Sequence, residues 1–245
     1  MNITDYLINP MGKGSSVLSL PSRRKELDSQ YKELNSKIRI IWYMIGEKNL
    51  IAHVKIPSRR HVRLYYDVLV QLDIESLPAN THVVNDCIIK VFSNCPSFTY
   101  TYAYVFNQHK DLIEWTKRKY PAEVLSKKPT QRNPYEVLSY ERSLYFAFKY
   151  ITSNGRNYID QIKTESIKIT SYTRILSTIQ SVDLIKEINN DFNTKKREKI
   201  EQPKKQIKNL NKKKESLNTQ KRTTRITPST NKINNTKKTK KTKKI

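Results

Sequence analysis

Charge is divided very unevenly along this chain, and the division limits how much of it can fold. Residues 194–245 carry 20 Lys and Arg against three Glu, a balance of +17, and residues 1–193 carry 27 basic and 19 acidic groups, a balance of +8. No aromatic residue follows Phe192. Ordering a backbone costs roughly 1–2 kcal/mol per residue, and a segment with so little apolar surface cannot offset that cost. We therefore expect a disordered Lys-rich tail over residues 194–245.

A flexible polycation predicts a polyanionic partner, and nucleic acid is the usual one. We expect the tail to contact the phosphate backbone without sequence preference, with double-stranded DNA as the leading partner. The candidate contact residues in the tail are Lys195, Lys196, Arg197, Lys204, Lys205, Lys212, Lys213, Lys214, Lys221, Arg222, Arg225, Lys237, Lys238, Lys240 and Lys241.

A short motif in the body adds four candidate residues. Pro21-Ser22-Arg23-Arg24 recurs as Pro57-Ser58-Arg59-Arg60. A hydroxyl and two guanidiniums at the start of an element, where backbone N–H groups are also free, suit a phosphate oxygen. Two solvated turns would produce the same pattern in so basic a chain. The candidates are Arg23, Arg24, Arg59 and Arg60.

The residues before the tail predict an α+β fold with a mainly antiparallel sheet in the N-terminal half and helices in the C-terminal half. Residues 1–21, with Pro10, Gly12, Gly14 and Pro21, predict an extended N-terminal arm. Residues 22–193 are long enough for one domain with a hydrophobic core. Apolar alternation predicts strands over residues 38–45, 50–56, 62–73, 86–92 and 98–106, with a turn or bulge at Cys95-Pro96.

Helical spacing and capping residues predict the helices. Ser22 is a possible N-cap for a helix over residues 22–36, and residues 111–120 predict a short helix stopped by Pro121. Asn133, Pro134 and Glu136 form a strong N-terminal signature for a helix running to about Thr152. Residues 173–192 predict a long amphipathic helix that leads into the tail.

Tyrosine is the distinctive aromatic residue of the body, with 15 in the chain against six Phe and two Trp. Tyr100, Tyr102 and Tyr104 would share one face of the predicted strand over residues 98–106. Exposed, that face would resemble the stacking surfaces that bind single-stranded nucleic acid. Buried, it would lie under the helix that ends near Thr152, and the apolar side of that helix favours burial.

The spacing of His and Cys residues does not favour a metal site or a catalytic cysteine. His53, His61, His82 and His109 are scattered over different predicted elements, and no Cys-x-x-Cys pair exists, so we expect no structural zinc and no other cofactor. Cys87 and Cys95 are expected to be buried free thiols. Cys95, before Pro96, is a weak candidate nucleophile.

A metal-dependent nuclease is the least favoured alternative. Asp67, Asp73, Glu75, Asp86 and Lys90 lie in the strand region and could outline such a core. The acidic residue expected two positions before the lysine is replaced by Ile88, and Asp67 is expected on the polar face of its strand. Gly12-Lys13-Gly14-Ser15 lacks the first glycine of a phosphate-binding loop and is assigned to the arm.

The segment over residues 88–107 (IIKVFSNCPSFTYTYAYVFN) resembles a pattern of structural proteins of tailed bacteriophages. In that pattern a valine-rich strand meets a Cys/Ser-Pro-Ser-Phe turn and then an aromatic strand. The segments over residues 131–134 and 141–147 are similar to companion motifs, so the resemblance covers roughly 60 residues between 88 and 147. It implies a virion-associated protein and transfers no catalytic residue.

Together these observations predict a non-enzymatic virion protein, located in the virion or in the host cytoplasm. Its body would dock on other virion proteins or on copies of itself. The chief alternative is a free protein that binds single-stranded DNA or RNA through Tyr100, Tyr102 and Tyr104. A membrane partner is not expected, because no stretch of 18 apolar residues and no secretory leader is present.

Overall fold

The computed structural model describes residues 1–8, 16–59, 61, 63–77, 81–130, 133, 136, 138, 140–153 and 158–191, with the side chains of residues 16–20 excepted. The chain divides into two units, Met1–Asn190 and Asp191–Ile245. Nearly all described residues belong to the first unit. The tail, with every candidate contact residue in it, lies outside the described residues.

A five-stranded sheet forms the centre of the first unit, in the order β4-β3-β2-β1-β5. Strands β1 to β4 pair antiparallel, and β5 joins β1 in parallel through residues 43–45. The mainly antiparallel α+β fold predicted from the sequence is confirmed. The strands are β1 (Arg39–Ile45), β2 (Asn49–Pro57), β3 (Tyr65–Asp73), β4 (Ile88–Ser93) and β5 (Ile167–Ile169).

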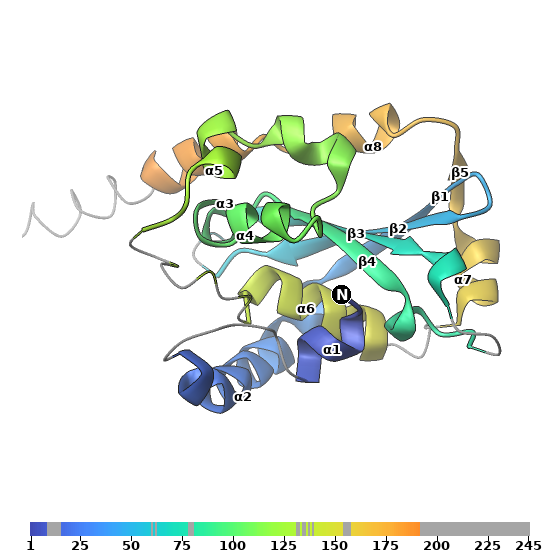
Figure 1. Cartoon of the computed structure of the whole chain (residues 1–245), viewed down its shortest axis with the longest axis horizontal. Coiled ribbons are helices and arrows are strands. Elements are labelled where there is room, and N and C mark those ends of the chain that lie inside the picture. The colour runs from blue at the N-terminus through green and yellow to red at the C-terminus, as the bar shows by residue number, and fades with distance from the viewer. Residues whose placement is uncertain are drawn as a thin grey trace, which may run out of the picture. The chain divides into compact units, whose positions relative to one another are not determined.

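Helices cover both faces of the sheet, as Figure 1 shows. One layer contains α1 (Ile3–Ile8), α2 (Ser16–Leu34) and α6 (Arg142–Ser153); the other contains α3 (Pro96–Thr101), α4 (Ala103–Gln108), α5 (Ala122–Ser126) and α8 (Thr173–Thr178). The helix α7 (Ile159–Glu165) lies beside β5. Short 3₁₀ helices span Asn35–Lys37, Ile74–Ser76, Val84–Asp86 and Glu114–Lys119.

Coverage on both faces explains why the central strands do not alternate between buried and exposed residues. In β2, every residue from Leu50 to Val54 is buried, and in β3 every residue from Tyr66 to Val70 is buried. The sequence predicted one polar face for residues 62–73, containing Asp67. That prediction is wrong for Asp67, which is 2% exposed.

The described residues of the predicted N-terminal arm are helical from Ile3 onward, and residues 9–15, with Gly12-Lys13-Gly14-Ser15, lie outside the described residues. Residues 3–8 form α1, and Ile3 and Tyr6 are fully buried in the core. The Tyr6 hydroxyl oxygen accepts a hydrogen bond from the Glu141 backbone N–H, directly before α6, at 2.9 Å. Helix α2 then begins at Ser16, six residues before the predicted N-cap, and includes Pro21. Leu27 and Tyr31 of α2 are buried as their spacing predicted.

Residues 98–106 form helices α3 and α4 instead of the predicted strand. Pro96 occupies the first turn of α3, where its missing N–H costs nothing. Phe98 and Phe106 are fully buried and their ring centroids lie 5.3 Å apart. Tertiary packing of these rings overrides the strand preference of a Thr- and Tyr-rich segment. Tyr100, Tyr102 and Tyr104 therefore share no strand face.

The helix predicted from Asn133 begins instead at Arg142. The Asn133 amide donates to the Thr101 carbonyl at 3.2 Å and does not cap a helix. Glu136 has a φ of 54°, which no α-helix accommodates. Glu141 serves as the cap of α6, because its carboxylate accepts from the Leu144 N–H at 3.0 Å.

The long C-terminal helix is interrupted. Helix α8 ends at Thr178, and a second helical segment covers residues 182–191. Ile175, Ile179, Val182 and Ile185 are buried, as the predicted apolar spacing required. Residues 111–120 contain the 3₁₀ helix Glu114–Lys119 where a short helix was predicted. No helix within the described part of the chain has the length and apolar character needed to cross a bilayer.

Candidate nucleic-acid interface

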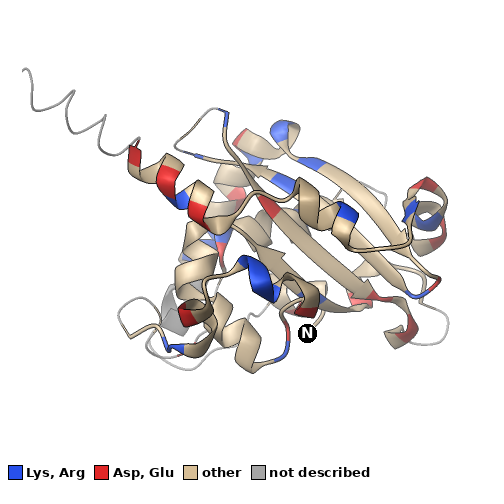
Figure 2. Cartoon of the chain, turned by 90° about the horizontal axis from the view of Figure 1, so that it is seen from above, with Lys and Arg blue, Asp and Glu red and all other residues tan. Residues whose placement is uncertain are grey.

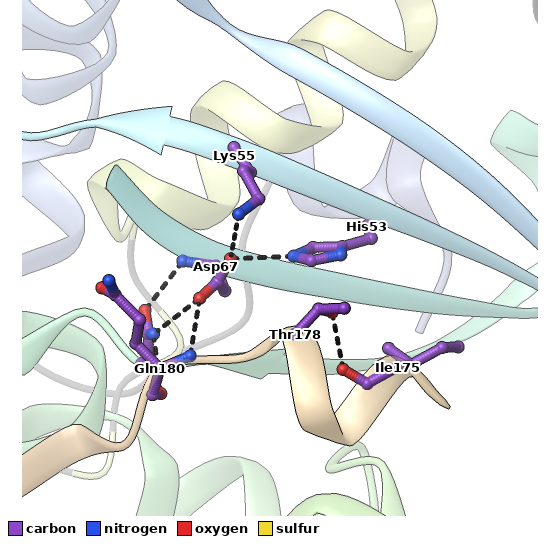
Figure 3. Close-up of polar contacts among 7 residues, drawn as sticks. His53, Lys55, Asp67, Ile175, Thr178 and Gln180 are labelled. Atoms are coloured by element: carbon purple, nitrogen blue, oxygen red, sulfur yellow. Dashed lines mark hydrogen bonds and ion pairs between the residues drawn. The ribbon is translucent and has the colours of Figure 1, made fainter. Parts of the chain in front are cut away.

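The most connected polar cluster in the body centres on Asp67 of β3, drawn in Figure 3. One carboxylate oxygen accepts from His53 Nε2 at 2.8 Å and lies 3.7 Å from Lys55 Nζ. The other accepts from the Asn94 amide and from the Gln180 N–H, both at 3.1 Å. Because an ionised carboxylate only accepts hydrogen bonds, His53 donates through Nε2.

This cluster fastens the segment after α8 to the sheet. Asn94 accepts from the Asp67 N–H at 2.8 Å and donates to the Gln180 carbonyl at 3.1 Å. His53 is 1% exposed. The Thr178 hydroxyl, also drawn in Figure 3, donates to the Ile175 carbonyl at 2.7 Å. Asp67 and His53 are buried in this cluster, whereas Lys55 is 39% exposed, and the hydrogen bonds hold the segment after α8 against the sheet.

A second buried polar cluster surrounds Glu141 at the start of α6. Its carboxylate accepts from the Ser143 hydroxyl at 2.5 Å, and Ser143 bonds to the Ser93 hydroxyl at 2.9 Å. Tyr120 donates its hydroxyl to the Ser93 carbonyl at 3.1 Å. Burial raises the pKa of Glu141 above its ordinary value, although the hydrogen bonds from Ser143 and Leu144 oppose the change. These contacts join β4, α6 and the segment after the 3₁₀ helix at Glu114–Lys119.

Both cysteines are buried free thiols, as predicted. Burial raises the pKa of Cys95 to about 12, and burial likewise raises the pKa of Cys87 to about 12. A thiol with such a pKa is protonated at neutral pH, so it is a poor nucleophile. Cys95 has the environment of a core residue.

The carboxylates considered for a nuclease core are spread over the sheet. Asp67 and Asp73 stand six residues apart in β3, a separation of about 20 Å at the usual strand rise. Glu75 pairs with Lys48 at 2.6 Å, and Lys90 of β4 lies opposite Gln71. Within the described ranges, no three His, Cys, Asp or Glu side chains are grouped so that they could hold a metal ion.

The two Pro-Ser-Arg-Arg motifs occupy unlike positions. Arg23 and Arg24 lie inside α2, not at its start, and Arg23 pairs with Glu26 at 2.8 Å. The second motif follows β2, where Ser58 is buried and bonds to the Tyr66 hydroxyl at 3.3 Å. Arg59 is exposed, and Arg60 lies outside the described residues. The repeat therefore does not define one structural motif.

Two of the three predicted tyrosines, Tyr100 and Tyr104, line a cavity between the α3–α4 pair and α5. All three rings are partly buried against the core, and Tyr100 and Tyr104 form part of the cavity wall. The cavity has a volume of about 380 Å³. Its other lining residues are Thr99, Thr101, Glu123, Val124, Lys127, Lys128, Pro129 and Thr130.

Cations gather around this cavity more than acidic groups do. Lys127 and Lys128 are exposed at its rim, where Lys128 pairs with Glu136. Lys186, on the helical segment 182–191, places its ammonium 5.4 Å from the centroid of the Tyr100 ring. Glu123 supplies a carboxylate to the lining. An aromatic wall with a lysine rim suits a planar, negatively charged ligand.

Elsewhere on the described body, basic and acidic residues are interspersed, as Figure 2 shows. Several pair locally: Lys48 with Glu75, Lys117 with Glu114, and Lys149 with Asp28. Local pairing weakens the field that the body presents to a distant polyanion.

These features define a class, an α/β body with a lysine-rimmed aromatic cavity, followed along the chain by a basic segment. No family model, curated protein or solved structure matches the chain.

Sequence reasoning singled out the tyrosines but missed the residues that complete the cavity. Nothing in the sequence distinguishes Lys127 and Lys128 from the many other lysines of this basic chain. Thr99 falls within the strand predicted over residues 98–106, so the sequence does not predict its place in a cavity wall. The sequence did contain one usable sign, Pro96 directly after a strand-like run, because proline is favoured in the first turn of a helix.

Proposed function

We propose that this chain is a non-enzymatic, virion-associated protein of a tailed bacteriophage. Its body docks on other virion subunits or on copies of itself, and residues 194–245 bind the nucleic-acid backbone without sequence preference. The observation that carries the proposal is the charge division, +17 over residues 194–245 against +8 over the preceding 193 residues. The virion assignment is supported by the resemblance between residues 88 and 147.

The resembling pattern contains two strands, and only the first of them is present in the fold. Residues 88–93 form the strand β4, but the aromatic segment after Pro96 is helical. The pattern's second strand is therefore absent here. The virion assignment depends on the sequence motif itself and requires its own test.

Duplex binding tests the tail's role. If about eight tail charges contact phosphates, log K falls with log salt at a slope of about −7. A chain ending at residue 193 should lose most of its affinity and most of this salt dependence. Equal affinity and equal slope for both chains would refute the proposal.

Particle composition tests the virion assignment separately. Mass spectrometry of purified phage particles should detect this polypeptide at a constant ratio to the major capsid protein. Its absence from particles that were made while the protein was being expressed would remove the virion half of the proposal and leave the tail's role untouched.

A free single-strand-binding protein is the second candidate. The observation that favours it is the cavity lined by Tyr100 and Tyr104. In that case the affinity would reside mainly in the body, and replacing these tyrosines would weaken binding more than removing the tail.

A further inference from the structure

The cavity beside α5 has the size of a small-ligand site. Its volume of about 380 Å³ falls within the roughly 300–1,000 Å³ typical of such sites. Tyr100 and Tyr104 contribute aromatic surface from α3 and α4, and Val124 contributes apolar surface from α5. A flat aromatic ligand would find both ring surface and apolar surface there.

Two hydroxyls at this cavity have no hydrogen-bond partner among the described residues. Thr99, which lines the cavity, is 1% exposed, and its Oγ1 atom is unpartnered. The hydroxyl of Tyr100 is buried and unpartnered in the same way. Both hydroxyl oxygens are closed to solvent, so a side-chain rotation would bring them to the cavity, where a ligand with hydrogen-bonding edges would satisfy them.

The rim supplies positive charge for an anionic group. Lys127 is exposed beside the cavity, and Lys186 lies over the Tyr100 ring. The carboxylate of Glu123 opposes them in part, and Glu136 already engages Lys128. Lys127 and Lys186 are therefore the cations best placed to meet a phosphate.

We propose that this cavity binds one unstacked nucleotide of a single-stranded nucleic acid. The base stacks on Tyr104 or Tyr100, its polar edge meets the Thr99 hydroxyl once that side chain rotates toward the cavity, and the adjoining phosphate lies near Lys127. Stacking tolerates every base, because each has a π face. A duplex offers no free base face, so the cavity discriminates single strands from duplexes.

This inference deepens the proposed function and rests on it for the identity of the polyanion. It adds a contribution that differs from that of the tail in its physical origin. Tail binding depends on phosphate charge and falls steeply with salt, whereas stacking persists in high salt. The two contributions can therefore be separated in one full-length protein.

The experiment uses the full chain at high salt, where counterion release contributes little. Fluorescence anisotropy measures binding to a labelled oligothymidylate and to a duplex with the same number of phosphates. The variants are Tyr104→Leu, which removes the ring, and Tyr104→Phe, which keeps it. The matched control is Tyr158→Leu, because Tyr158 is 57% exposed and does not line the cavity.

Tyr104→Leu should weaken oligothymidylate binding on the order of tenfold, while duplex binding stays unchanged. Tyr104→Phe and Tyr158→Leu should bind the oligothymidylate as the unaltered chain does. Equal affinities for Tyr104→Leu and Tyr158→Leu would overturn the proposal.

If circular dichroism shows that Tyr104→Leu does not fold, the variant Lys127→Gln tests the cavity proposal instead. Lys127 is exposed, so its replacement should leave the fold intact. Losing one single-strand phosphate contact lowers the magnitude of the salt slope by about 0.7. An unchanged slope for oligothymidylate would overturn the proposal.

Failure of the tail hypothesis gives a different result. If duplex binding is absent or independent of salt, the proposed function fails, yet a Tyr104-dependent affinity for oligothymidylate can still be measured. If duplex binding follows salt but Tyr104 has no effect, only the cavity assignment fails.

Discussion

The body and the tail use charge in opposite ways. Residues 1–193 carry 27 basic and 19 acidic groups, an excess of only +8, whereas residues 194–245 carry 20 basic groups and three acidic ones. In the body, Asp67 and Asp28 each engage a lysine from a neighbouring element, so charge helps to hold the fold together. In the tail, 20 cations accompany only three acidic groups, and we propose that another molecule supplies the opposite charge.

This contrast separates two kinds of failure. Substitutions in the polar clusters of the body should lower the free energy of unfolding and leave phosphate binding intact. Substitutions in the tail should do the reverse. Any substitution that changes both quantities strongly would show that the two regions are not independent.

Asp67→Ala should give the largest effect on stability. It leaves His53 and the Gln180 N–H without their buried acceptor, and breaking such a network costs about 3–5 kcal/mol. Urea unfolding followed by circular dichroism measures the change. Tail-dependent duplex binding, measured where the variant is still folded, should match that of the unaltered chain; a parallel loss would break the comparison.

Neutralising part of the tail should change binding alone. Replacing Lys237, Lys238, Lys240, Lys241, Lys243 and Lys244 with Gln removes six of the 20 tail cations. If contacts are spread evenly, the salt slope for duplex DNA changes from about −7 to about −5. The urea midpoint should not move. A slope that stays at its original value would place the phosphate contacts elsewhere.

Asp28→Asn should cost less, about 1 kcal/mol, because both Asp28 and Lys149 are one-third exposed. Partial burial favours the neutral acid, but Lys149 and Tyr145 outweigh it and lower the pKa of Asp28 below 3.8. The contribution is therefore complete above pH 3.8 and disappears as pH falls through the folded-state value. Unfolding curves for the two chains should differ at neutral pH and converge in acid; a constant difference would contradict the assignment.

Glu141→Gln tests the opposite sign. Because burial raises the pKa of Glu141 above 4.5, the folded chain holds this proton more tightly than the unfolded chain does. Stability from this site is therefore lost as pH rises from 4.5 through the folded-state value. The free energy of unfolding of Glu141→Gln, relative to the unaltered chain, should increase over that range. A difference that decreases with pH would show the carboxylate to be stabilised as an anion.

The sequence predicted the parts of the fold in which local pattern and tertiary packing agree. Strands β1 to β4, and the buried positions Leu27 and Ile185, follow directly from apolar spacing. The sequence predictions are wrong where contacts between residues far apart in the chain determine the local structure. Asn133 has the chemistry of an N-cap but bonds to Thr101, and Glu141, 135 residues from Tyr6, caps α6 instead.

The candidate site was predictable in composition but not in geometry. Tyr100 and Tyr104 stood out as aromatic residues beside basic ones, yet an i, i+2 pattern suggested a strand face. Only the packing of Phe98 and Phe106 places them on helices next to Lys127. The burial of Asp67 was not predicted because it depends on the segment after α8, which lies against the sheet and contacts Asp67 through Gln180, 113 residues away.

The salt dependence of duplex binding by the full chain tests the central claim most directly. Titrations over a range of salt concentrations should give a straight line of log K against log salt with a slope of about −7, and the line should flatten in a chain that ends at residue 193. A slope near zero for the full chain, or the same slope in both chains, would contradict the assignment of phosphate binding to the tail.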